Sequence, residues 1–296
     1  MSRRARLRAK SRERGDERRH GRDTKNPSAS GAMVWLWLTL PIAILTAVAT
    51  GSELLVDDLF RGDAPYFVAQ AIGQDVITLG AALPALMVGG ILAARGSGRG
   101  RLVWLGALTY LVYTYVIYAF HVSFNSLFLV YVTLLGCSLY ALIGGLATTD
   151  FTGIKARFTP ETPARVVSIF LAVVAVLFYI SWLGEVIPAL VAGGVPQSVV
   201  DNGTPTNGVY VLDMAWILPA FALTAIWLWR KLDMGYALAG ALLTFMSLLL
   251  FAIMGMVVSM SLYGQPVTLG MAAVFGLVAT VSLGLAVWYL KELSGR

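Results

Sequence analysis

The chain has 296 residues, of which 58% are hydrophobic and 13% are charged, and its mean hydropathy is +0.75. Soluble domains average about 25% charged residues, so this composition excludes a soluble globular protein and is typical of an integral membrane protein. A single cysteine excludes an intramolecular disulfide. There are two histidines, and one of them, His20, lies in the N-terminal tail, which excludes a bis-histidine haem and a His-rich zinc cage. The sequence therefore predicts neither a metal centre nor a bound cofactor.

The first 30 residues form a basic tail ahead of the apolar part of the chain. Residues 1–25 carry eleven lysines and arginines against four acids, with almost no large apolar side chain. Such a segment cannot bury enough surface to offset its ordering entropy, so we expect residues 1–30 to be disordered. Basic residues beside a membrane span attract anionic lipid headgroups, which are the expected partner of this tail. A solvated topology signal is the alternative.

From Met33 onward, apolar runs alternate with short polar breaks, so residues 31–296 form a single transmembrane domain. A helix needs about 20 apolar residues to cross a bilayer. Eight stretches meet this length, and the sequence predicts an all-α polytopic helix bundle. The predicted spans are 33–50, 67–94, 102–121, 126–147, 166–190, 210–229, 235–262 and 268–290.

The basic residues test this assignment. With the N-terminus in the cytoplasm, 21 of the 22 lysines and arginines fall on the cytoplasmic side, and only Arg61 falls outside. Cytoplasmic loops of membrane proteins carry an excess of lysine and arginine. The pattern therefore predicts eight spans with both termini inside the cell.

Two halves of the chain show a weak similarity. Asp75 precedes Leu83-Pro84-Ala85, Asp213 precedes Leu218-Pro219-Ala220, and a basic residue stands eleven positions after each proline. Spans 1–4 would then correspond to spans 5–8 as a parallel repeat about an axis along the membrane normal. The alternative is that such short motifs are common in membrane helices.

Three acidic side chains lie inside predicted spans. Asp75 follows Gln74 and lies about 12 Å from the outer end of the second span, at 1.5 Å per helical residue. Glu185 is close to the outer end of the fifth span, and Asp213 is close to the outer start of the sixth. An ionisable side chain is costly in hydrocarbon and indicates a functional site by default.

His121 ends the third span and Asn125 opens the fourth, at a similar height, whereas Glu53 falls in the polar segment between the first two spans. We therefore expect an outward-facing acidic pocket. Its predicted residues are Gln74, Asp75, His121, Asn125, Glu185 and Asp213. The alternative is structural: Asp75 bonds a neighbouring helix, Glu185 lies at the interface, and Asp213 caps the sixth span.

Several short motifs resemble a family of uncharacterised multi-pass bacterial membrane proteins. They are Gly73-Gln74-Asp75, the aromatic stretch from Tyr113 to Asn125 with Phe128 and Tyr131, and Pro205-Thr206-Asn207 followed by Val211-Leu212-Asp213. The resemblance covers residues 67–233 and leaves out the basic tail. It implies a bacterial inner-membrane setting and no particular chemistry.

Acidic side chains within spans favour a transporter or permease for a small solute or a cation, because protonation changes their cost in the membrane. Two other functions stay open. A membrane enzyme would use two of the carboxyls as acid and base. A non-catalytic sensor or assembly protein would need no pocket.

Overall fold

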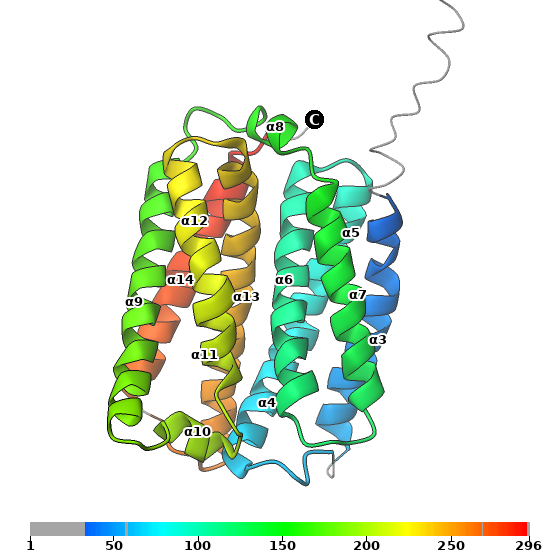
Figure 1. Cartoon of the computed structure of the whole chain (residues 1–296). Helices are drawn as coiled ribbons and strands as arrows, with labels where there is room; N and C mark the ends of the chain where they lie inside the picture. The colour runs from blue at the N-terminus through cyan, green and yellow to red at the C-terminus, as the bar shows by residue number, and fades with distance from the viewer. Residues whose placement is uncertain (1–32, 57–58, 268, 295–296) are drawn as a thin grey trace, which may run out of the picture.

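The computed structural model describes residues 33–56, 59–267 and 269–294, so the tail expected to be disordered lies outside the described residues. Eight helices are long and apolar enough to cross a membrane, and no strand is present among the described residues. The predicted all-α bundle of eight spans is therefore confirmed (Figure 1).

The first, third, fourth and fifth spans are formed by α3 (Thr39–Leu55), α6 (Gly98–His121), α7 (Phe128–Ala147) and α9 (Ala164–Val191). The second span joins α4 (Pro65–Ile77), η1 (Thr78–Ala82) and α5 (Leu83–Ala94), and the sixth joins α11 (Gly208–Leu212), η2 (Asp213–Ile217) and α12 (Leu218–Trp229). The last two spans are α13 (Asp233–Leu262) and α14 (Leu269–Lys291). The short helices α8 (Phe151–Lys155) and α10 (Gln197–Asn202) lie in the loops on either side of α9.

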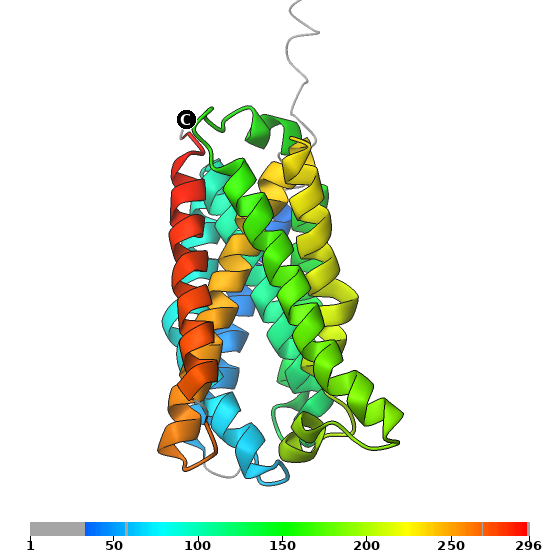
Figure 2. The same ribbon diagram turned by 90° about the vertical axis from the view of Figure 1, so that its left-hand side faces the viewer.

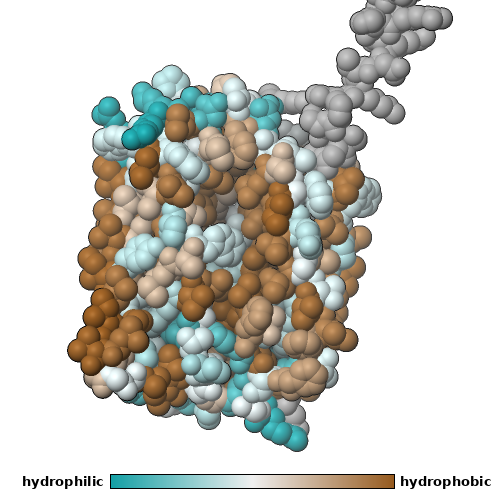
Figure 3. All heavy atoms as spheres, in the orientation of Figure 1, coloured by the Kyte–Doolittle hydropathy of each residue, from teal (hydrophilic) through white to brown (hydrophobic). Residues whose placement is uncertain are grey.

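The two ends of the bundle differ in charge. The loop with α8 and the C-terminal end of α14 lie at one end, and α10 lies at the other, in both ribbon views (Figures 1 and 2). Nine of the ten described lysines and arginines are near the first end, which we call the basic end, and Arg61 is near the opposite, or far, end. Between the ends the visible surface is mostly hydrophobic (Figure 3).

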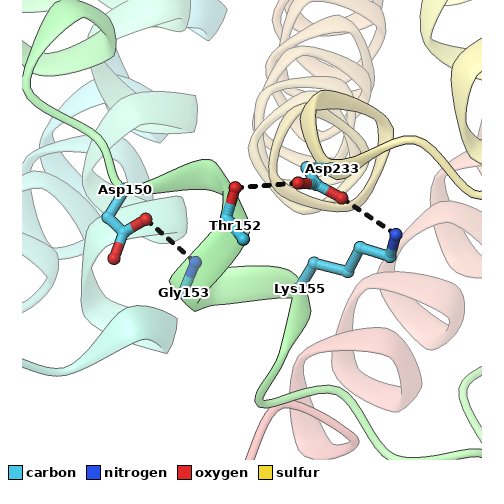
Figure 4. Close-up of polar contacts among 5 residues, drawn as sticks. All are labelled: Asp150, Thr152, Gly153, Lys155 and Asp233. Atoms are coloured by element: carbon cyan, nitrogen blue, oxygen red, sulfur yellow. Dashed lines mark hydrogen bonds and ion pairs between the residues drawn. The ribbon is translucent and has the colours of Figure 1, made fainter.

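The linker between the two halves is fastened at the basic end. The Asp150 side chain accepts from the Gly153 amide at 2.9 Å and so caps α8. Thr152 Oγ1 and Lys155 Nζ donate to the two carboxylate oxygens of Asp233 at 2.8 and 2.9 Å (Figure 4). These contacts tie the α7–α9 connection to the start of α13.

Helices α6 and α13 form the centre of the bundle, and 78% of the central stretch of α6 is buried. Glycines allow the close approach. A Cβ atom added to Gly106 would lie 2.5 Å from the Ala241 carbonyl oxygen, and one added to Gly73 would lie 2.3 Å from the Gly255 carbonyl oxygen. Small residues at helix crossings take the place of a hydrophobic driving force in the bilayer.

The second and the sixth span each carry a π-helical turn directly before Leu-Pro-Ala, at Thr78–Ala82 and at Asp213–Ile217. Proline lacks an amide hydrogen and its ring clashes with the carbonyl four residues earlier, so a wider turn relieves the helix at that point. The two turns stand at the same distance from their prolines, which supports the predicted repeat. When the two spans are aligned on Pro84 and Pro219, Asp213 corresponds to Thr78, and Asp75 corresponds to Tyr210.

Candidate functional site

A cavity of about 240 Å³ occupies the far half of the bundle, between α4, α6, α9, α11 and α13. Pockets for drug-sized ligands span about 300–1,000 Å³, so this one suits a smaller molecule. Apolar and aromatic side chains make up most of its wall. The polar side chains of the wall include Gln70, Gln74, His121, Asn202, Asn207 and Asp213.

Asp213 is the acidic side chain of this wall and is only 6% exposed. Its Oδ1 accepts from the Tyr113 hydroxyl at 3.0 Å, and its Oδ2 accepts from the Trp182 indole Nε1 at 2.9 Å. The Trp182 ring stacks on Tyr210 with the ring centres 4.5 Å apart. Each carboxylate oxygen has a second lone pair, so Asp213 can accept further hydrogen bonds from a ligand.

The segment 192–207, which contains α10, forms a cap beside the cavity. The Gln70 amide donates to the Asn202 side-chain oxygen at 3.0 Å and joins the cap to α4. Glu185 lies at the edge of the cap, where its Oε1 accepts from the Ser198 amide at 2.9 Å and its Oε2 accepts from the Tyr210 hydroxyl. Glu185 is thus joined to the wall through Tyr210 and does not itself line the cavity.

His121 lines the cavity and packs against the start of α11, because a Cβ atom at Gly208 would lie 2.1 Å from the His121 ring. Asn125 is elsewhere. Its side-chain oxygen accepts from the Leu127 amide at 2.9 Å, and its amide donates to the Leu59 carbonyl at 3.1 Å. The structure therefore places Asn125 in the loop before α7, outside the cavity wall.

Gln74 lines the cavity and donates to Thr114 Oγ1 at 3.0 Å, whereas its neighbour Asp75 is fully buried and does not line it. Asp75 Oδ1 accepts from the Tyr118 hydroxyl at 2.9 Å, and Tyr118 is part of the wall. One tyrosine thus separates Asp75 from the cavity. The structure brings Gln74, His121 and Asp213 to one cavity and leaves the other three predicted residues outside its wall.

A second buried acid, Glu53, is 5% exposed and stands near Asp75, because the tyrosines that donate to the two carboxyls, Tyr118 and Tyr131, pack with their ring centres 5.5 Å apart. Glu53 Oε1 accepts from the Tyr131 hydroxyl at 2.5 Å. The sequence reasoning missed Glu53 because it ended the first span at residue 50, whereas α3 continues to Leu55. A signal was present: Thr46, Thr50 and Glu53 are spaced by four and three residues, which places them on one helix face.

Among the described residues, no group of three or more His, Cys, Asp or Glu side chains is arranged to hold a metal ion. Comparisons with protein-family models, with curated proteins and with solved structures find no match for the chain. The eight apolar helices indicate a multi-pass membrane protein in contact with the lipid bilayer.

Proposed function

We propose that the protein is a transporter that takes up a small organic cation through the cavity at its far end. One observation carries the proposal: a single carboxyl group, Asp213, stands in an otherwise largely apolar and aromatic cavity. The cavity lies between helices of the first four spans and helices of the last four. Transporters with internal repeats bind their substrates at such repeat interfaces.

The cavity wall determines the class of substrate. Aromatic faces attract cations through their quadrupole, and a carboxylate with free lone pairs accepts from an ammonium group. The apolar remainder of the wall suits a hydrocarbon or aromatic body. A small amine that carries one aromatic ring satisfies both requirements within about 240 Å³.

The orientation and the cellular setting belong to the same proposal. The positive-inside rule assigns the basic end to the cytoplasm, so the cavity opens toward the outside. The membrane is a bacterial inner membrane, as the resemblance of the sequence motifs implies. The basic tail of residues 1–25 then lies at the cytoplasmic leaflet, where anionic headgroups attract it.

A membrane enzyme that uses two carboxyls is the less favoured function. Acid–base catalysis by a carboxyl pair requires both groups within reach of one substrate. Asp213 is the only acidic side chain among the described residues of the cavity wall. The arrangement favours binding of a solute over this chemistry.

The test uses the purified full chain in liposomes, with tritiated phenethylamine as the probe. We expect saturable binding and faster uptake than in protein-free liposomes. Asp213→Asn should weaken binding at least about tenfold, or about 1.4 kcal/mol. The matched control is Asp233→Asn, an acid-to-amide change at the basic end, which should bind as the unmodified chain does.

A second comparison isolates the charge of the probe. The neutral analogue 2-phenylethanol should compete far more weakly than phenethylamine, since it lacks the ammonium group. The proposal fails if uptake equals that of protein-free liposomes, or if Asp213→Asn and Asp233→Asn bind the amine equally well.

A further inference from the structure

Four buried oxygens near Asp75 have no hydrogen-bond partner in the described part of the chain. They are Thr46 Oγ1, Glu53 Oε2, Asp75 Oδ2 and Tyr115 Oη. The large majority of buried side-chain polar atoms in proteins have a hydrogen-bond partner, so several unpaired oxygens in one place require an explanation. For the two carboxyl oxygens, Glu53 Oε2 and Asp75 Oδ2, the simplest explanation is a bound species that the ionised side chains do not supply.

The four oxygens belong to one cluster. The Tyr115 ring centre lies 5.8 Å from that of Tyr118 and 6.3 Å from that of Tyr131, the two tyrosines that donate to the carboxyl pair. The rings of Tyr118 and Tyr131 in turn lie with their centres 5.5 Å apart. The cluster therefore collects side chains from α3, α4, α6 and α7 around one point.

The carboxyls themselves indicate the missing species. Ionised carboxylates only accept hydrogen bonds, so the contact between Glu53 and Asp75 cannot be a hydrogen bond without an added proton. Two adjacent negative charges are also costly at this depth in a membrane protein. One proton removes a charge and gives the two orphan carboxyl oxygens a hydrogen bond to share.

Among the residues that the structure describes, no other acidic side chain acts on the pair. The described titratable groups that face it are four tyrosines, Tyr110, Tyr115 and Tyr118 from α6 and Tyr131 from α7. Helix α13, which packs against α4, carries no ionisable side chain between residues 237 and 262. The hydroxyl groups of the tyrosines solvate the pair without supplying a countercharge.

We propose that Glu53 and Asp75 form a proton-binding site that holds one shared proton and drives the transport of the cation in the cavity. The proton binds to a carboxylate oxygen and leaves from it, and no other bond forms or breaks. Tyr118 joins the two sites, because its hydroxyl donates to Asp75 while its side chain lines the cavity. The coupling rests on the proposed transport function, but the shared proton does not.

Infrared difference spectroscopy on the full chain in lipid tests the proton without a substrate. We expect a protonated-carboxyl C=O band that shifts in D₂O and that is shifted or lost in both Glu53→Gln and Asp75→Asn, because either change removes one of the two carboxyls that share the proton. Tyr118→Phe and Tyr131→Phe leave both carboxyls in place and should shift the same band. Asp233→Asn, the control, should leave it unchanged.

Two other results would overturn the shared proton. A band that keeps the same frequency and intensity in both carboxyl variants overturns the shared proton. The shared proton is also overturned if the spectrum shows two carboxylate bands that change when sodium is replaced by choline. Such a change would identify a bound metal cation in place of the proton.

Coupling is tested by uptake of tritiated phenethylamine with and without an imposed pH gradient. We expect the gradient to change the rate of the unmodified chain at least about tenfold, or about 1.4 kcal/mol, and to have no effect on Asp75→Asn. Uptake that ignores the gradient in the unmodified chain refutes the coupling and leaves the transporter standing. The infrared band without any uptake refutes the transporter and leaves the proton site standing.

Discussion

The crossing of α4 and α13 at Gly73 and Gly255 should not tolerate a side chain. In Gly255→Ala the added Cβ would lie 2.5 Å from the Gly73 carbonyl oxygen and 2.8 Å from Ile77 Cγ1. Non-bonded carbon atoms prefer about 3.5–4.0 Å, and the carbonyl belongs to a helix backbone, so the two helices must separate. Overpacking of this kind costs about 1–3 kcal/mol, and we expect Gly255→Ala to lose that much stability.

Unfolding in mixed micelles, followed by tryptophan fluorescence, measures the loss. Gly136→Ala and Gly284→Ala are matched controls, because nothing lies within 4 Å of the added Cβ in either helix. Alanine is the better helix former, so the controls should be unchanged or more stable by up to about 1 kcal/mol. Equal stability of Gly255→Ala and Gly136→Ala would contradict the packing argument.

Three further outcomes are expected. Asn202→Ala removes the acceptor of the Gln70 amide, so it should loosen the cap and speed dissociation of phenethylamine in a washout assay. An unchanged dissociation rate would show that the cap does not retain the bound amine. Reporter fusions after residues 100 and 200 should report opposite sides of the membrane, because 21 of 22 basic residues select one orientation; the same side for both would refute eight spans. Deleting residues 2–25 should leave thermal unfolding unchanged and weaken binding to vesicles that contain anionic lipid, by about 1 kcal/mol per basic residue near the surface; equal binding would make the tail a topology signal only.

The fold could be predicted from the sequence because a bilayer requires long apolar helices, and these appear in the sequence as uninterrupted apolar runs. The error at the end of the first span has the same origin. Gly51 and Ser52 look like a helix break in a soluble protein, but backbone groups within the membrane must bond internally, so α3 continues to Leu55. That extension brings Glu53 from an assumed loop into the core.

The candidate site could be predicted from the sequence only in part. Depth along each span placed Gln74, His121 and Asp213 at one level, and all three line the cavity. Depth does not give the rotation of a helix about its axis, which decides that Asp75 points away from the cavity. The hydrogen-bond donors to Asp213 could not be predicted from the sequence either. Tyr113 is 100 residues away from Asp213 in the chain, and the sequence pattern around it indicates only a packing residue.

The two π-helical turns place different side chains, Thr78 and Asp213, at equivalent positions of the second and the sixth span. In the first half the turn begins at Thr78, whose hydroxyl bonds Tyr110 at 2.8 Å inside the closed core. In the second half it begins at Asp213, which is bonded by Tyr113, one turn further along α6, in the wall of the cavity. The glycine crossing at Gly73 and Gly255 holds α4 of the first half against α13 of the second half, two residues before Asp75. The carboxyl pair therefore lies within the first half, whereas the cavity with Asp213 lies between the two halves, and α6 supplies a tyrosine to each, Tyr118 to Asp75 and Tyr113 to Asp213.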